Sequence, residues 1–356
     1  MALSLRDLRA ACARRRIGGW LLEGEEKATG LPLSICVAAQ LESKNYLAGL
    51  AFRRHRERAL GLAWRGKMLR EVLSARANHM ITVFDGEAAR RRPACFEVPS
   101  WVYGEIVLEQ AMARMRESRN IGRDLERLRR QGLTCEWTRD AGALADFYWR
   151  MYLPYGRSRF GEGAVLVSWP AFLQAIPRAE LMLVKRDGQA IAGGVLVRDG
   201  TEIISWVLGV RDGDPALVRT GVLSALYCFK IPELRTRGHE RVQIGSTRAF
   251  LSDGVLRFKR KWGARLIRAS AEHLQLTVRR LTPGACAFLQ HNPFIYRRSG
   301  ELRAAVWAGG GVEPATLFRE YMLPGLAAID LYAPGNPLPL TTQAVAGDPG
   351  TRTEDA

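Results

Sequence analysis

The sequence is poor in the residues that build disulfide frameworks and metal sites. Its 356 residues include six cysteines and five histidines. The cysteines are scattered without a C-x-x-C pair, and the histidines are isolated from one another. This pattern indicates neither a zinc site nor a disulfide-stapled fold. We therefore expect reduced thiols and no bound metal ion.

Long apolar runs are also missing. The uncharged stretches 31–41, 164–177 and 281–296 each contain proline, and all are shorter than the roughly 20 residues that a membrane-spanning helix needs. The first turns of the chain mix charged with apolar residues and lead into three arginines at 14–16, where a signal peptide would have an apolar core. We therefore expect a cytoplasmic protein without a transmembrane segment.

Lysine is scarce although the chain is strongly basic. The formal net charge is +17, but only seven of the 53 basic residues are lysine and 46 are arginine. Clustered basic residues attract phosphate. An arginine excess spread along the chain can, however, arise from GC-rich coding without selection for binding. We expect no DNA partner, and tRNA stays open as a partner.

The length and the 47% of hydrophobic residues allow two domains of ordinary size, each with its own core. Within 181–209, three short apolar strands are separated by Asp187-Gly188 and Asp199-Gly200, which are hairpin signals and predict an antiparallel meander. A helix should follow over 217–236. The buried face of this helix should consist of Leu223, Leu226, Tyr227 and Ile231. A strand should then begin at Arg241.

Other segments give weaker signals. A helix over 108–131 should end at Gly132, which supplies a left-handed cap, and a strand over 133–137 should follow. Helical spacing resumes over 143–152. The Arg-rich run from Phe52 indicates a solvated helix face. From Pro334 the chain is rich in Pro, Gly, Thr, Asp and Ala without apolar periodicity, which predicts a disordered tail.

Three stretches resemble a known group of enzymes. They are the Arg/Asn-rich segment 118–133, Asp146-Phe-Tyr followed by Tyr152 and Arg157, and the run 244–264. The last run contains Ile-Gly-Ser-Thr-Arg, followed by Gly-x-x-x-Phe-Lys-x-x-Trp-Gly. In order and spacing they are similar to the second domain of Fem-type (FemAB-like) aminoacyltransferases and their CelD-like relatives in the GNAT superfamily.

This resemblance implies an α/β (α+β) GNAT-like acyl-CoA N-acyltransferase fold with two tandem lobes. We expect an N-terminal lobe over 1–117, for which length is the only support, and a C-terminal acyltransferase domain over 118–333. The disordered tail would occupy 334–356. The expected activity is transfer of an acyl group to an amine or a hydroxyl, and one candidate acceptor is a sugar or a cell-envelope precursor.

The resemblance also implies a catalytic role for Lys259. Acyl transfer needs a place for the carbonyl oxyanion and a sink for the acceptor's proton. An exposed lysine near the developing charge or near the phosphates would serve electrostatic catalysis. Alternatively, Lys259 to Lys261 form a basic turn before Trp262, and Asp253 is an N-cap of the helix that follows it.

Six further residues are candidates for binding the donor or the acceptor. Two arginines lie beside two tyrosines, and a guanidinium binds phosphate or carboxylate through two hydrogen bonds. The rival interpretation is a solvated loop. The two remaining residues belong to the Ile-Gly-Ser-Thr-Arg segment. The six are Tyr152, Tyr155, Arg157, Arg159, Ser246 and Arg248.

The identity of the donor stays open. Ordinary acetyl-CoA sites carry Arg/Gln-x-x-Gly-x-Gly/Ala at the start of the central helix, whereas this chain has Val218-Arg-Thr-Gly-Val-Leu223. We expect acyl-CoA as a co-substrate and no tightly bound cofactor. Aminoacyl-tRNA is the alternative donor, although no long helical arm is visible. A catalytically inactive GNAT-like module that binds a partner is the third possibility.

Overall fold

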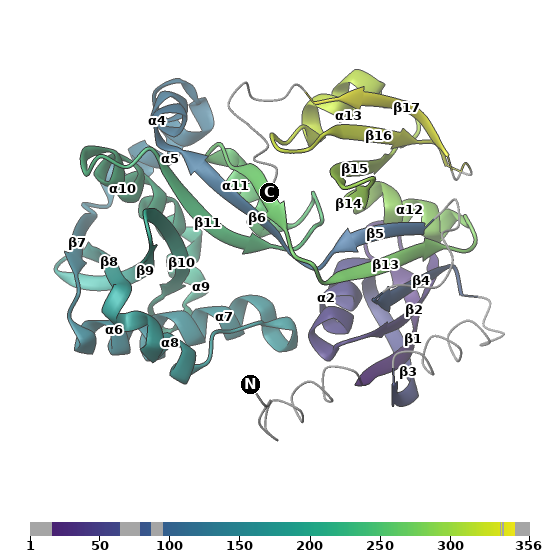
Figure 1. The fold of residues 1–356 in the computed structure, drawn as a ribbon, viewed down its shortest axis with the longest axis horizontal. Coiled ribbons are helices and arrows are strands. Elements are labelled where there is room, and N and C mark those ends of the chain that lie inside the picture. Colours follow the sequence, from purple (N-terminus) through teal and green to yellow (C-terminus); the bar gives the residue numbers. More distant parts are fainter. Residues whose placement is uncertain (1–15, 65–78, 87–94, 335, 337, 346–356) are drawn as a thin grey trace. The chain divides into compact units, whose positions relative to one another are not determined.

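The computed structural model (Figure 1) describes residues 16–64, 79–86, 95–334, 336 and 338–345. They form two compact units, each built on one large sheet. Unit 1 consists of 1–102, 248–256 and 269–356, and unit 2 consists of 103–247 and 257–268.

Unit 2 contains a seven-stranded sheet in the order β12-β6-β11-β10-β9-β8-β7. Strands β7 to β10 are consecutive antiparallel neighbours, whereas β11 runs parallel to β10. The predicted meander and the predicted strand before it are therefore confirmed. The bounds are β6 Val102–Val107, β7 Thr134–Thr138, β8 Ala179–Arg186, β9 Gln189–Asp199, β10 Glu202–Val210, β11 Arg241–Thr247 and β12 Arg265–Ala269.

The helices of unit 2 are interrupted more often than the sequence pattern suggested. The predicted helix over 108–131 is broken at Ser118, whose side chain accepts a hydrogen bond from the Ile121 amide and caps the second half. Gly132 has a φ of 59° and ends that half as predicted. The bounds are α4 Leu108–Glu117, α5 Arg119–Arg130, α6 Ala141–Phe147, α7 Leu153–Phe160, α8 Trp169–Ala175, α9 Pro215–Arg219 and α10 Val222–Thr236. A π-helix, η1 Tyr148–Tyr152, joins α6 to α7, and short 3₁₀ turns occupy η2 Gly161–Gly163, η3 Ile176–Arg178 and η4 Arg211–Gly213.

These helices cover both faces of the unit 2 sheet, as Figure 1 shows. Met182 and Val184 of β8 pack into the core formed with α4, α5 and α10. Their neighbours Leu181 and Leu183 pack into the core formed with α6, η1 and α8. This alternation follows from the period of two in a strand. It explains why β8 is apolar at successive positions.

Unit 1 contains a ten-stranded sheet in the order β17-β16-β15-β14-β5-β13-β4-β2-β1-β3. The bounds are β1 Arg16–Glu26, β2 Pro32–Ala39, β3 Phe52–Trp64, β4 Ile81–Asp85, β5 Cys95–Pro99, β13 His273–Val278, β14 Phe294–Arg298, β15 Glu301–Trp307, β16 Ala328–Tyr332 and β17 Pro339–Ala344. Its helices are α2 Leu41–Ala51, α12 Pro283–His291 and α13 Pro314–Tyr321. Helix α11, Gly254–Lys261, begins in unit 1 and ends in unit 2.

The units differ from a linear division of the chain at residues 117 and 333. Strand β13 pairs with both β4 and β5, so segments from the two ends of the chain form one sheet. Pairing between strands so far apart in the chain cannot be recognised from local sequence patterns. The boundaries of the two units therefore could not be predicted from chain length alone.

Two local expectations are wrong. The Arg-rich run from Phe52 belongs to the long strand β3 and not to a helix, although its arginines are exposed as expected. The expected disorder from residue 334 does not hold for β17, which pairs with β16. Residues 346–356 lie outside the described residues.

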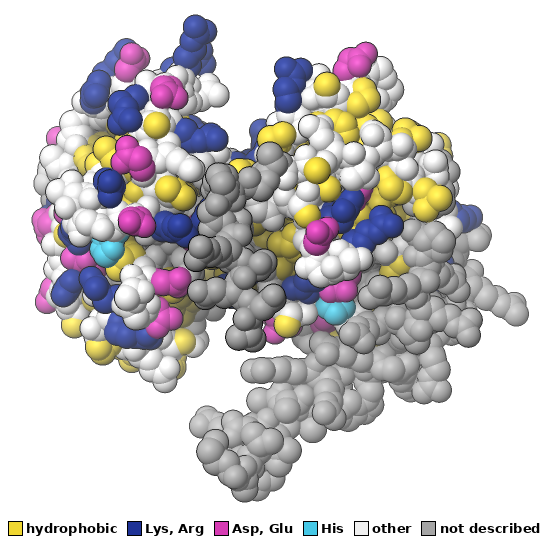
Figure 2. Space-filling model, turned by 45° about the horizontal axis from the view of Figure 1, so that its top comes forward, with side chains coloured by type: hydrophobic (Ala, Val, Ile, Leu, Met, Phe, Trp, Pro, Cys, Tyr) yellow, Lys and Arg dark blue, Asp and Glu magenta, His cyan; other side chains and the backbone are white. Residues whose placement is uncertain are grey.

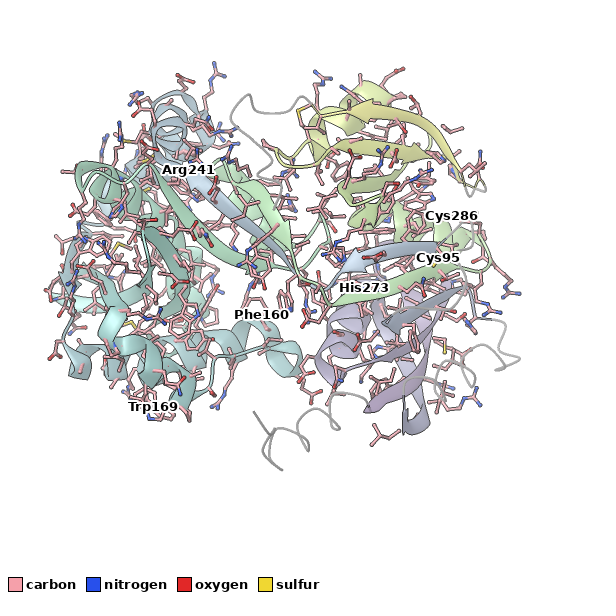
Figure 3. The ribbon with its side chains drawn as sticks, in the orientation of Figure 1. Cys95, Phe160, Trp169, Arg241, His273 and Cys286 are labelled. Atoms are coloured by element: carbon pink, nitrogen blue, oxygen red, sulfur yellow. The ribbon has the colours of Figure 1, made fainter. Side chains whose placement is uncertain are left out.

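The described cysteines are unpaired, and the described helices are short. The five described cysteines, at 36, 95, 135, 228 and 286, are free thiols, and Figure 3 shows Cys95 and Cys286 on separate elements. Burial raises the pKa of Cys228 to about 12, which keeps it a thiol. In the described ranges, no helix is long and apolar enough to cross a membrane.

Gly209 provides a test of how β10 meets η1. A Cβ at this position would lie 2.5 Å from the Met151 carbonyl carbon and 2.6 Å from the Tyr152 amide nitrogen. We expect Gly209→Ala to lower the free energy of unfolding by about 1–3 kcal/mol, because backbone must shift to admit the methyl group. Urea unfolding would measure the change.

The matched control is Gly122→Ala in α5, where an added Cβ meets no atom within 4 Å. Alanine is the better helix former, so this variant should gain about 0.5–1 kcal/mol. Equal unfolding midpoints for the two variants would contradict the close packing of β10 on η1.

Candidate active site

The candidate site of unit 2 lies where the regular pairing of β10 and β11 is interrupted. The parallel pairing of these strands is limited to Ile204 opposite Gln243. A bulge between Ser205 and Val207 displaces the next residues of β10. The two strands stay close past this pair, since a Cβ added at Gly245 would lie 3.6 Å from the Ser205 carbonyl oxygen. Backbone groups that an interruption of regular pairing leaves without strand partners can bind a substrate.

Lys259 reaches this part of β11 from α11. Its Nζ donates hydrogen bonds to the carbonyl oxygens of Gly245, at 3.2 Å, and Ser246, at 3.0 Å, both on β11. The structure thus brings Lys259 and Ser246 together, through the backbone of Ser246. The expectation of an exposed lysine is wrong, because Lys259 is only 7% exposed.

Asp253 holds the first turn of α11. Its Oδ1 accepts hydrogen bonds from the backbone amides of Val255, at 2.8 Å, and Leu256, at 3.1 Å. These two bonds satisfy amides that the helix itself leaves without partners. The interpretation of Asp253 as an N-cap is confirmed.

Lys230 is a second buried lysine, which the sequence reasoning missed. It lies on α10 and is 2% exposed, and its Nζ donates a hydrogen bond to the Ser205 hydroxyl at 2.7 Å. The same nitrogen lies 4.0 Å from the centre of the Tyr227 ring. Burial, and then the positive charge of Lys259, lower the pKa of Lys230 to about 7. The neutral form of Lys230 is therefore accessible near neutral pH.

A signal for Lys230 was present in the sequence. The predicted buried face of this helix included Leu226, Tyr227 and Ile231, and Lys230 lies four residues after the first and three after the second. Helical spacing therefore places a charged side chain on an apolar stripe. A lysine at such a position needs a polar partner. Ser205 is that partner here, and no local pattern connects the two.

The start of α10 differs from an ordinary phosphate cradle. The helix follows Gly221, which has a φ of 90°. The carboxylate of Asp124 accepts hydrogen bonds from Ser224, in the first turn of α10, and from Lys261. The Asp124 carboxylate therefore lies near the N-terminus of α10, where the helix dipole is positive. In an ordinary acetyl-CoA site, the pyrophosphate of the donor binds at this end of the helix.

The predicted tyrosines have structural contacts. The Tyr152 hydroxyl accepts a hydrogen bond from the Val167 amide at 2.8 Å, and Tyr155 is buried in the core beneath α7. Arg157 and Arg159 are exposed in the last turn of this helix, whose end at Phe160 is visible in Figure 3. Among the described residues, neither guanidinium forms a hydrogen bond or an ion pair. No contact in unit 2 joins them to Lys259.

Arg248 belongs to unit 1, whereas Lys259 and Ser246 belong to unit 2. It is 9% exposed, and its guanidinium carbon lies 5.0 Å from the ring centre of Tyr46 and 4.1 Å from that of Trp101. Burial lowers the pKa of Arg248. The two rings and the nearby Asp253 favour its charged form.

A cavity of about 620 Å³ lies elsewhere in unit 2, beside the C-terminal end of α10. None of the predicted site residues lines it. Arg237, on its wall, forms ion pairs with Glu180 at 2.7 Å and with Glu233 at 2.8 Å. Arg178 likewise pairs with Asp199 at 3.3 Å. Because these charges are already compensated, we assign the cavity no role in the chemistry.

Comparison with known proteins gives distant likenesses to solved structures. No family model and no curated protein matches the chain. FemX is 14% identical, with 72% of this chain and 84% of that chain covered and a TM-score of 0.37. L-PGS from Bacillus licheniformis is 13% identical over 72% and 80%, with a TM-score of 0.33. A GCN5-related N-acetyltransferase from Kribbella flavida is 10% identical over 94% and 80%, with a TM-score of 0.27. At such values, function has to be inferred from this chain's own residues.

Proposed function

We propose that unit 2 is a GNAT-like acyltransferase that moves an acyl group from a thioester donor to an amine or a hydroxyl. The observation that carries this proposal is the pair of buried lysines that contact the neighbouring strands β10 and β11. Lys230 contacts β10 through Ser205, and Lys259 contacts β11 through two backbone carbonyls. Meander, helix and parallel strand follow one another in the order that turn signals and helical spacing predicted.

The two lysines suit the two needs of acyl transfer. The acceptor's nitrogen or oxygen attacks the thioester carbonyl, the new bond to carbon forms, and the carbon–sulfur bond breaks to release the thiolate. The neutral fraction of Lys230 takes the acceptor's proton. Lys259 supplies a fixed positive charge that favours the oxyanion of the tetrahedral intermediate. Its bonds to β11 hold that charge in place before the substrate binds.

For the donor, we propose acyl-CoA. On the face seen in Figure 2, the Lys and Arg side chains of the described residues are scattered among acidic and uncharged ones. The carboxylate of Asp124 near the first turn of α10 argues against the usual pyrophosphate contact. A CoA donor would therefore bind its phosphates through other groups. For the acceptor, we propose a sugar or a cell-envelope precursor. We propose that the reaction takes place in the cytoplasm, where both candidate donors occur.

The proposed activity is tested by following both donors. Release of free thiol from acetyl-CoA and loss of the aminoacyl group from aminoacyl-tRNA would be measured with a panel of amines and hydroxyl compounds. Acceptor-dependent turnover of either donor supports an acyltransferase. Binding of a donor without turnover under all conditions would favour the inactive binding module.

Replacement of Lys259 should affect both chemistry and folding. We expect Lys259→Met to lower acceptor-dependent turnover by about 100-fold, the usual cost of removing one electrostatic contact to an oxyanion. Because Gly245 and Ser246 lose a donor, the free energy of unfolding should also fall by about 1–3 kcal/mol. Steady-state kinetics and urea unfolding would measure the two effects.

The control for Lys259 is Lys185→Met on β8, whose ammonium pairs with Glu136 away from α11. Lys259→Arg should recover part of the lost turnover because it restores the charge. If Lys259→Met loses stability but keeps full turnover once folded, Lys259 has a structural role only.

Lys230 should determine the pH dependence of turnover. The groups that face its ammonium are Lys259, the Ser205 hydroxyl and the Tyr227 ring. Since only the neutral amine accepts a proton, turnover should rise with pH and level off above an apparent pKa near 7. Lys230→Met should be slow at every pH and should lose this rise. An unchanged pH profile in Lys230→Met would exclude Lys230 as the proton acceptor.

The same residue should leave a mark on stability. The ordinary pKa of lysine, 10.5, applies to the unfolded chain, and folding lowers it to about 7. Between these values the unfolded state binds more protons, so the free energy of unfolding contributed by Lys230 rises with pH. Below pH 7 its full unfavourable contribution remains. Lys230→Met should be less pH-dependent in urea unfolding between pH 7 and pH 9.

Salt dependence separates the two donors. A tRNA surface neutralises several phosphates, so the logarithm of affinity should fall steeply with the logarithm of salt, by about 0.7–0.9 for each phosphate contact. CoA carries few phosphates and should give a shallow slope. We expect measurable CoA binding with the shallow slope. Tight, salt-sensitive binding of bulk tRNA without CoA binding would reverse the choice of donor and leave the roles of Lys230 and Lys259 unchanged.

A further inference from the structure

The loop that carries Arg248 is firmly attached to unit 1. The Leu251 amide donates to the Pro293 carbonyl at 2.8 Å, and the Ile295 amide donates to the Ala249 carbonyl at 2.7 Å. Phe250 forms an isolated bridge with Phe294 of β14. The position of the Arg248 backbone is therefore fixed by the sheet and not by its side chain.

The aromatic groups around Arg248 are also fixed. The Trp101 amide donates to the Ser270 hydroxyl at 3.1 Å, and the Ser270 amide donates to the Trp101 carbonyl at 2.9 Å. Tyr46, on α2, donates its hydroxyl proton to Asp253 Oδ2 at 3.2 Å. The faces of both rings thus pack against the guanidinium and fix the orientation of its plane. The N–H groups at the edge of the guanidinium are left available for hydrogen bonds.

The Arg248 guanidinium has no hydrogen-bond acceptor within the part of the chain that the structure describes. Asp253 is near enough to act on its charge, but both carboxylate oxygens bind other groups, the amides of α11 and the Tyr46 hydroxyl. Five N–H donors on a side chain that is nine-tenths buried are costly to leave unused. The arrangement is therefore incomplete without an acceptor.

Two observations leave room for an acceptor beyond the described residues. The nitrogens of Arg248 are not among the fully enclosed polar atoms that lack partners, so a small group can still reach them. The Ser252 hydroxyl, four residues along the same loop, is enclosed and has no partner among the described residues. Two polar groups of one short, well-anchored loop thus lack the hydrogen bonds that buried polar groups normally make.

We propose that Arg248, held by Tyr46 and Trp101, is a binding site in unit 1 for an oxyanion, the phosphate or carboxylate group of a small-molecule ligand. A planar guanidinium matches the spacing of two oxygens on either group and forms two parallel, charge-assisted hydrogen bonds. Burial strengthens these bonds because the surroundings screen the charges less than water does. The inference does not depend on the acyl transfer proposed for unit 2.

The experiment is calorimetric titration of the full chain with inorganic pyrophosphate in one arm and succinate in the other. Both are measured at physiological ionic strength, where weak attraction to exposed basic residues is screened. We expect saturable binding in at least one arm. In that arm Arg248→Met should bind about tenfold more weakly or worse, because it loses two charge-assisted hydrogen bonds. The arm that responds identifies the phosphate or the carboxylate as the preferred group.

Arg268→Met is the matched control. The Arg268 guanidinium also lies over an aromatic ring, that of Tyr103 at 3.8 Å, but the side chain is exposed. This variant should bind the oxyanion as the unaltered protein does. Equal weakening in both variants would show that the anion responds to net charge and would overturn the proposal.

A second variant covers the case in which Arg248→Met fails to fold. Arg248→Lys keeps a cation over the rings but loses the planar pair of donors, so the protein should stay folded and bind several-fold more weakly. Thermal unfolding of each variant without ligand checks that the fold is intact. Binding of neither oxyanion by the unaltered protein, or undiminished binding by a folded Arg248 variant, would overturn the proposal.

Discussion

The site of unit 2 depends on how briefly β10 and β11 pair in regular register. Ile204 opposite Gln243 is their pair of Cα partners, and β10 has a bulge between Ser205 and Val207. Ser205 and Gly245 follow this pair on the two strands. They supply polar groups that Lys230 and Lys259 bind.

Burying two lysines in one unit carries a large desolvation penalty, and the two side chains have different partners that offset it. Lys259 binds two backbone carbonyls, which favour the charged ammonium. Lys230 contacts the Ser205 hydroxyl and the face of the Tyr227 ring, which are weaker partners for a full charge. The positive charge of Lys259 also repels its charged form. The outcome for Lys230 is a side chain whose neutral form is accessible near pH 7. A strongly shifted pKa of this kind is typical of acid–base sites.

Unit 1 uses a buried cation in another way. Arg248 lies over two rings that hydrogen bonds fix from behind, and its N–H edge has no acceptor in the described residues. Arg268 in unit 2 lies over one ring and faces solvent, where water satisfies its donors. The difference in burial separates a cation that needs a ligand from one that does not.

The sequence by itself determined the elements with strong local signals. Asp187-Gly188 and Asp199-Gly200 fixed the meander through turn geometry, and Gly132 ended its helix through its left-handed φ. Asp253 could be interpreted as the N-cap of the helix that follows it. Only the tertiary structure decided the partners of Lys230 and Arg248 and the return of β13 between β4 and β5. The physical reason is that these contacts join residues far apart in the chain. Periodicity and turn chemistry report on neighbours along the chain, whereas burial and missing hydrogen-bond acceptors exist only once the chain has folded.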